Sequence, residues 1–129
     1  MLEIRGVHAG YGRSMVLHGV SIGIVRGTVT ALLGRNGMGK STLCRVLMGL
    51  IPLRDGTLTL DNNDISKLPP HRLAQMGIGY VPQGRDIFGD FTVQENLQLG
   101  LTTRGGRVPS HIHEWFPMLR SEEHTSELQ

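Results

Sequence analysis

The sequence has little of what several classes of protein depend on. Its 129 residues contain one cysteine, Cys44, so no internal disulfide framework can hold the fold together. The longest apolar stretch, VLMGLIPL, is interrupted by Gly49 and Pro52 and is much shorter than the roughly 18 residues of a membrane-spanning helix. The N-terminal stretch MLEIRGVHAG carries charges where a secretory signal has an apolar run, so we expect no export.

An excess of one charge sign is also missing. The formal net charge is +2, and the arginines are spread singly along the chain. Aromatic residues make up 5% of the sequence and do not alternate with basic ones. Because a nucleic-acid surface needs clustered basic residues, often with aromatic ones between them, we do not expect nucleic acid as a partner. The hydrophobic content of 39% and charged content of 19% are typical of a folded globular domain.

The apolar pattern predicts an α/β fold. Residues 1–27 alternate as strands do, and residues 28–33 form a short apolar run ending in glycine, which is typical of a buried parallel strand. A helix is predicted from Lys40 to about Gly49, with Leu43, Val46, Leu47 and Leu50 on one face and Cys44 as a small buried residue. Five further segments follow: an alternating strand (55–65), a helix opened by proline (68–77), a buried strand (78–83), a helix with a capping box at Thr92 and Glu95 (92–101), and a short amphipathic segment (111–119).

The C-terminal stretch RSEEHTSELQ differs abruptly from what precedes it. It is polar and acidic, and it resembles the in-frame translation of a sequencing-library adapter. We therefore expect two segments: residues 1–119, the N-terminal part of a domain, and residues 120–129, a non-native tail. The alternative is a solvated acidic tail.

One motif carries specific chemistry. The stretch GRNGMGKST, Gly34–Thr42, fits the pattern G-x-x-x-x-G-K-[ST] between a predicted strand and a predicted helix. Glycines at positions 34, 37 and 39 allow successive backbone N–H groups to face a phosphate without obstruction by side chains, and the helix N-terminus adds positive potential. A glycine-rich turn that merely ends a strand is the alternative.

The polar residues of this loop have distinct expected roles. The Lys40 ammonium can reach β- and γ-phosphates, and the Ser41 hydroxyl can complete the coordination of Mg²⁺. Thr42 supplies a further donor near the α-phosphate. The residues of the loop expected to bind the nucleotide are Gly34, Arg35, Asn36, Gly37, Met38, Gly39, Lys40, Ser41 and Thr42.

This loop resembles that of ABC transporter ATPases, in which an Asn-Gly pair precedes the second glycine. Two further residues match the family. Tyr11 is at the place of the aromatic residue that stacks on adenine, although a tyrosine in the core is the alternative. Gln83, after YVP, begins the family's glutamine loop, where a carboxamide can contact Mg²⁺ or the attacking water and sense a transmembrane partner.

The resemblance covers residues 1–119 and is nearest to importers for branched-chain amino acids and their urea or short-chain amide relatives. It implies a P-loop NTPase nucleotide-binding domain with an antiparallel β subdomain, truncated before the signature motif, with ATP and Mg²⁺ as cofactors. The implied partners are a second ATP-binding subunit, transmembrane permease subunits and, indirectly, a solute-binding protein. The implied location is the cytoplasmic face of the membrane. The choice between amino acid and amide stays open.

The family also uses elements that these residues do not contain: an LSGGQ-type signature, an aspartate that organises Mg²⁺, a catalytic glutamate and a switch histidine. Asp61 follows an alternating strand and is expected to be a turn residue. His111 and His113 are two apart on a helix, so they point to different faces and do not make a metal pair. We therefore expect nucleotide binding without hydrolysis by this chain alone. The alternatives are a small-molecule kinase with a P-loop and a nucleotide-binding module without catalysis.

Overall fold

The computed structural model describes residues 1–84, 87–101 and 106–120. They belong to two units, Met1–Tyr80 and Val81–Gln129. Most of the expected non-native tail, 121–129, lies outside the described residues. Among the helices that are described, none has the length and apolar content required to span a membrane.

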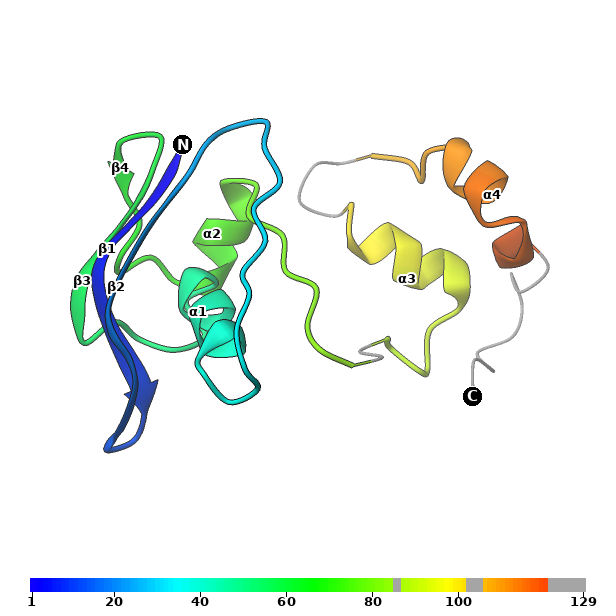
Figure 1. Ribbon diagram of the computed structural model, residues 1–129. Coiled ribbons are helices and arrows are strands. Elements are labelled where there is room, and N and C mark those ends of the chain that lie inside the picture. The colour runs from blue at the N-terminus through cyan, green and yellow to red at the C-terminus, as the bar shows by residue number, and fades with distance from the viewer. Residues whose placement is uncertain (85–86, 102–105, 121–129) are drawn as a thin grey trace. The chain divides into compact units, whose positions relative to one another are not determined.

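The first unit is built on a four-stranded antiparallel sheet with the order β2-β1-β3-β4 (Figure 1). Its strands are β1 (Leu2–Tyr11), β2 (Ser14–Ile24), β3 (Asp55–Leu60) and β4 (Asn63–Asp64). Ile4 of β1 lies opposite Ile22 of β2 and Leu58 of β3. Because directly opposed residues share one face of a sheet, these apolar side chains form a single layer. The strands expected from the alternation before residue 27 and after residue 55 are confirmed.

Two helices cover one face of this sheet, α1 (Lys40–Leu47) and α2 (Pro70–Gln75) (Figure 1). Leu43 and Val46 of α1 and Leu73 of α2 are buried. Each buried aliphatic side chain contributes about 1.5–3 kcal/mol of transfer free energy, so this layer holds α1 against the sheet. The buried core consists of Ile4, Val7, Ala9, Leu17, Leu43, Val46, Ile51, Leu58, Ile65 and Leu73.

The C-terminal end of α1 is a Schellman motif. Gly49 has a φ of 67°, its N–H donates to the carbonyl of Val46 at 3.0 Å, and the N–H of Leu50 donates to the carbonyl of Arg45 at 2.9 Å. Glycine adopts this left-handed conformation without the penalty that a Cβ would bring. The prediction that Gly49 stops the helix is confirmed. The placement of Leu50 on the buried face is wrong, because the chain turns there and leaves Leu50 54% exposed.

Two expected parallel strands are not formed. Residues 28–33 and 78–83 lie in no strand of the part of the chain that the structure describes. A parallel strand exists only where neighbouring strands exchange backbone hydrogen bonds with it, and none of the four strands of the described sheet pairs with either segment. Several apolar side chains of these segments are exposed, namely Val29 (100%), Leu33 (88%) and Val81 (92%), whereas Ile78 is partly buried against the core.

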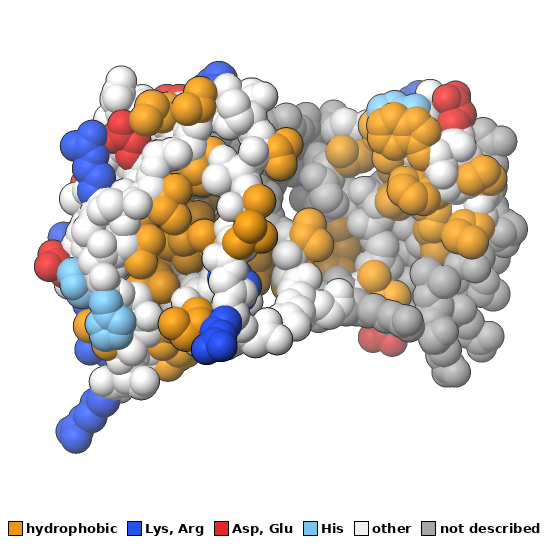
Figure 2. Space-filling view, in the orientation of Figure 1, with side chains coloured by type: hydrophobic (Ala, Val, Ile, Leu, Met, Phe, Trp, Pro, Cys, Tyr) orange, Lys and Arg blue, Asp and Glu red, His pale blue; other side chains and the backbone are white. Residues whose placement is uncertain are grey.

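Apolar surface of this kind favours self-association, and Figure 2 shows apolar side chains gathered on the visible face of the first unit. We expect the 129-residue chain by itself to elute from size exclusion as large, polydisperse species. The double variant Val29→Asn, Leu33→Asn should shift it toward monomer, whereas Leu50→Asn, outside this segment, should change little. A wild-type chain that is monomeric and unfolds cooperatively by circular dichroism would contradict this expectation.

The described part of the second unit contains the short helices α3 (Val93–Leu99) and α4 (His111–Trp115) and the 3₁₀ turn η1 (Pro117–Arg120). The expected capping box begins α3: the N–H of Glu95 donates to the Thr92 hydroxyl at 3.2 Å, and the N–H of Thr92 donates to the Glu95 carboxylate at 2.8 Å. The bond from the Thr92 N–H, and then one from the Thr92 hydroxyl to the same carboxylate at 2.9 Å, hold the pKa of Glu95 below its ordinary value. Local sequence therefore fixes the start of α3 as predicted.

Candidate functional site

The glycine-rich loop leads directly into α1 and allows the helix to begin close against β2. Gly37 and Gly39 have φ angles of 80° and 90°, in the left-handed region. A Cβ on Gly39 would lie 2.8 Å from Cδ2 of Leu17 and 3.3 Å from Cγ1 of Val16. Glycine is therefore required at position 39 for two reasons: the left-handed backbone conformation and the close approach of the loop to β2.

The N-terminus of α1 is suited to an anion. Gly39 is the N-cap residue, no side chain caps the helix, and its first turn contains no acidic residue. The N–H groups of Lys40, Ser41 and Thr42 lack an intrahelical acceptor by the geometry of any helix start. An oxyanion can satisfy them, and the helix dipole adds to the attraction.

Lys40 adds a full positive charge beside these amides. Its Nζ donates to the carbonyl of Gly34 at 2.6 Å and to the carbonyl of Arg35 at 2.7 Å. These two bonds hold the ammonium beside the start of the loop. A cation and a series of backbone N–H donors are therefore close together in one short segment. This donor set fits the phosphates of a nucleotide.

The other residues of the loop contribute mainly backbone and one hydroxyl. The side chains of Arg35, Asn36 and Met38 are exposed. The N–H of Met38 donates to the carbonyl of Arg35 at 3.4 Å, which closes the turn of the loop. Ser41 is exposed in the first turn of α1, and its hydroxyl is the kind of oxygen ligand that Mg²⁺ takes beside bound phosphates.

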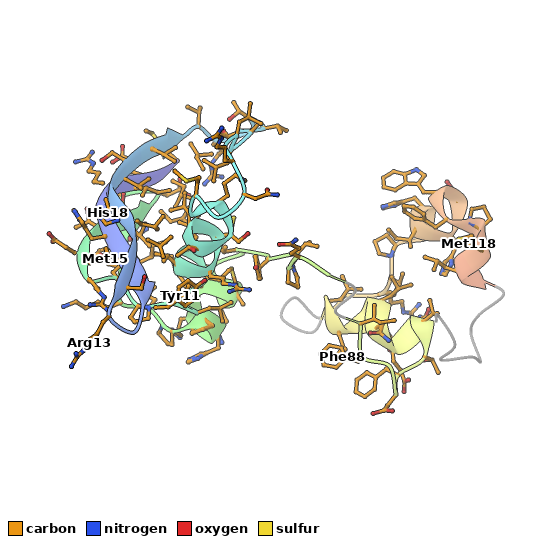
Figure 3. The ribbon with its side chains drawn as sticks, turned by 60° about the horizontal axis from the view of Figure 1, so that its bottom comes forward. Tyr11, Arg13, Met15, His18, Phe88 and Met118 are labelled. Carbon is orange, nitrogen blue, oxygen red and sulfur yellow. The ribbon has the colours of Figure 1, made fainter. Side chains whose placement is uncertain are left out.

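Tyr11, at the end of β1, is linked to α1 through its hydroxyl. Arg45 Nη1 donates to the Tyr11 hydroxyl at 3.0 Å. A hydrogen bond with the Thr42 hydroxyl, and then the one from Arg45, hold the pKa of Tyr11 below its ordinary value. The ring is 45% exposed, so the alternative of a core tyrosine is wrong. Figure 3 shows Tyr11 near the end of the β1–β2 hairpin.

Most of the expected residues belong to one unit of the structure. The loop, Lys40, Thr42 and Tyr11 all belong to the first unit, whereas Gln83 is an exposed residue of the second unit. Sequence reasoning missed Arg45. Its contact with Tyr11 joins residues 34 positions apart, so no local pattern in the sequence signals it.

Two smaller expectations, for Cys44 and Asp61, have clear outcomes. Cys44 is exposed rather than buried. Leu43 and Val46 are the residues of α1 that face the sheet, and Cys44, which follows Leu43, faces outward. Asp61 is a turn residue with a φ of 47°, and its carboxylate contacts the N-terminal amino group and Arg26. In the described residues no group of three or more His, Cys, Asp or Glu side chains could hold a metal ion.

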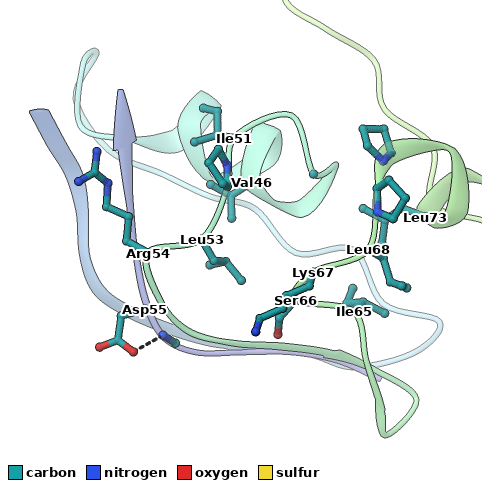
Figure 4. Close-up of a pocket in the computed structure, with 15 residues that line it drawn as sticks. Val46, Ile51, Leu53, Arg54, Asp55, Ile65, Ser66, Lys67, Leu68 and Leu73 are labelled. Carbon is teal, nitrogen blue, oxygen red and sulfur yellow. Dashed lines mark hydrogen bonds between the residues drawn. The ribbon is translucent and has the colours of Figure 1, made fainter. Parts of the chain in front are cut away.

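A separate hollow of about 560 Å³ lies in the first unit between the end of α1, the start of β3 and the turn before α2 (Figure 4). Apolar side chains such as Ile51, Leu53 and Ile65 line it, and Arg54 and Lys67 contribute charge. None of the residues expected to bind nucleotide contributes to its wall. The hollow therefore does not extend the phosphate loop.

Comparison with known proteins places these features in a family. The family model described as ABC transporter matches residues 17–129. The chain is 38% identical over 103 residues to the probable branched-chain amino acid transport ATP-binding protein LivF of Archaeoglobus fulgidus, which covers 80% of the chain and 44% of LivF. It is 37% identical over 128 residues to the lipopolysaccharide export system ATP-binding protein LptB of Escherichia coli K12, which covers 99% of the chain and 53% of LptB.

A solved structure of an ATP-binding cassette shows the same fold. The ADP conformation of MJ1267, an ATP-binding cassette of an ABC transporter, superposes with a TM-score of 0.78 at 28% identity and covers 100% of the chain and 59% of MJ1267. The expected fold class, a P-loop NTPase cassette with an antiparallel sheet, is confirmed. The chain spans about half the length of the curated relatives it matches.

Proposed function

Because this chain belongs to the ABC transporter family, we propose that it is the N-terminal part of the ATP-binding subunit of an importer. The proposed solutes are branched-chain amino acids or related small amides such as urea. The likeness to LivF supports the amino-acid type. LptB, a protein named for lipopolysaccharide export, is about equally similar, so the solute needs its own test.

The observation that carries the proposal is the start of α1. A helix with no side-chain cap and no acidic residue in its first turn follows a left-handed Gly39, and Lys40 adds an ammonium to the same segment. This arrangement combines backbone N–H donors, a helix dipole and a mobile cation. A triphosphate carries the charge and the acceptor oxygens that these donors need.

Each residue then has a proposed role toward MgATP. The backbone of Gly34–Thr42 surrounds the phosphates, and the Lys40 ammonium binds the β- and γ-phosphates. Tyr11 stacks on the adenine. Ser41 and Gln83 would hold Mg²⁺, which neutralises charge on the phosphates when bound. Gln83 would also contact the attacking water.

The partners are proposed from the family. In the complete transporter two ATP-binding subunits close on two ATP molecules, and permease subunits hold them at the cytoplasmic face of the membrane. A solute-binding protein outside the membrane delivers the solute. We propose that residues 1–119 are the native part of the chain, that residues 120–129 are not, and that hydrolysis requires groups outside these 129 residues.

The solute can be tested in proteoliposomes that contain the complete cassette, its permease subunits and its solute-binding protein. We expect ATP turnover to rise when the binding protein is loaded with leucine or with urea, because solute delivery drives closure of the cassettes. Ribose serves as the control and should leave turnover at its basal rate. If neither leucine nor urea stimulates turnover or enters the vesicles, the importer assignment is wrong.

A further inference from the structure

The hydroxyl of Tyr11 is held while its ring stays accessible. Arg45 Nη1 donates to this hydroxyl at 3.0 Å, and the Thr42 side chain lowers the pKa of Tyr11. The ring itself is 45% exposed. The bond from Arg45 is made at the far end of the side chain, so it restricts the rotation of the ring while the residue stays exposed.

Two tyrosines affect the pKa of the Arg45 guanidinium. A side-chain hydrogen bond to Tyr11 and then one to Tyr80 raise the pKa of Arg45 above its ordinary value. A guanidinium carries five N–H donors in a rigid planar fork, so it can serve both hydroxyls at once. Tyr11 ends β1 and Arg45 lies in α1, so two distant parts of the sequence meet at the hydrogen bond between them.

The helix connects this contact to the phosphate loop. Thr42 and Arg45 lie three positions apart, on one face of α1, and Thr42 is only 6% exposed. The helix that presents its N-terminal amides to a phosphate thus also fixes the direction of the Tyr11 ring. The distance between a bound phosphate and a stacked base is then set by a single rigid element.

We propose that Arg45 is a positioning residue for the nucleotide base: its guanidinium holds the Tyr11 hydroxyl and thereby fixes the ring on which a purine stacks. This inference rests on the proposed nucleotide site. Arg45 acts through Tyr11 and not on the phosphates. Its removal therefore weakens binding of a ligand that has a base and leaves binding of a bare polyphosphate unchanged.

The test compares two ligands by isothermal titration of the complete cassette, MgATP and magnesium tripolyphosphate. Arg45→Met keeps the apolar stem of the side chain and removes the donor. We expect it to weaken MgATP binding roughly two- to tenfold, the effect of one hydrogen bond, with tripolyphosphate unchanged. Tyr11→Phe should weaken MgATP binding to a similar extent. The double variant should lose no more than either single one, because both remove the same contact.

Arg13→Met is the matched control, since Arg13 is an exposed arginine in the turn that follows Tyr11 (Figure 3). It removes the same charge close to the same tyrosine and should leave both affinities unchanged. Thermal unfolding of each variant shows whether the fold is intact. Tyr11→Ala separates the positioning role of Arg45 from the proposed base site, because it removes the ring on which the base would stack.

Three results would overturn the positioning role: equal weakening of both ligands by Arg45→Met, additive losses in the double variant, or unchanged MgATP affinity. If Tyr11→Ala weakens MgATP binding but Arg45→Met does not, the positioning role alone fails. If Tyr11→Ala leaves MgATP affinity unchanged, the proposed base site is itself wrong.

Discussion

Replacing Lys40 by alanine in the complete cassette is expected to lower ATP turnover on the order of 10²–10³-fold, the usual effect of removing one charged donor from a transition state. The Nζ of Lys40 lies within 2.7 Å of two carbonyls of the loop, so its ammonium is already close to where β- and γ-phosphates would bind. Phosphoryl transfer depends on charge placed around these oxygens, and no other cation belongs to the first turn of α1. Turnover is measured as phosphate release at saturating MgATP.

Lys67, the other lysine of the chain, provides the matched control. It lines the separate hollow rather than the loop, so Lys67→Ala should keep turnover within a factor of about two, as expected for a surface substitution away from the site. Lys40→Arg keeps the charge and shows whether geometry also matters. Wild-type turnover and MgATP affinity in a folded Lys40→Ala protein would exclude the proposed role of Lys40.

The second large effect is expected at Gly39. Alanine there must adopt a φ of 90°, which costs about 1–2 kcal/mol for a residue with a Cβ. Its Cβ would also lie 2.8 Å from Leu17, and overpacking of this kind costs roughly 1–3 kcal/mol more. The complete cassette with Gly39→Ala should therefore be less stable by about 2–5 kcal/mol, measured as the shift in its urea unfolding midpoint.

Gly37→Ala separates backbone strain from the steric clash. Gly37 has a φ of 80°, but a Cβ there would meet no heavy atom within 4 Å. This variant should lose only the roughly 1–2 kcal/mol of the left-handed conformation. Equal losses at the two positions would show that the close approach of the loop to β2 does not stabilise the protein.

Elements set by local pattern could be predicted from the sequence. The alternation in β1 and β3, the proline that opens α2 and the capping box of α3 each specify one short segment without reference to distant residues. The motif that begins α1 could be predicted for the same reason, since its spacing of glycines and Lys40 is local.

Features that depend on distant partners could not be predicted. Residues 28–33 and 78–83 have the composition of buried strands, but a strand is formed by its neighbours, and no described strand pairs with them. The contact between Arg45 and Tyr11 joins residues 34 positions apart, so no local pattern reveals it.

The central claim is that the backbone amides at the start of α1, together with Lys40, bind a triphosphate. The most direct measurement is a titration of the ¹⁵N-labelled complete cassette with MgATP, followed through its backbone amide signals. We predict the largest shifts at residues 37–42, with adenine-dependent changes at Tyr11. Saturable binding that leaves those amides unshifted and moves signals around Lys67 and Ile65 instead would contradict the claim.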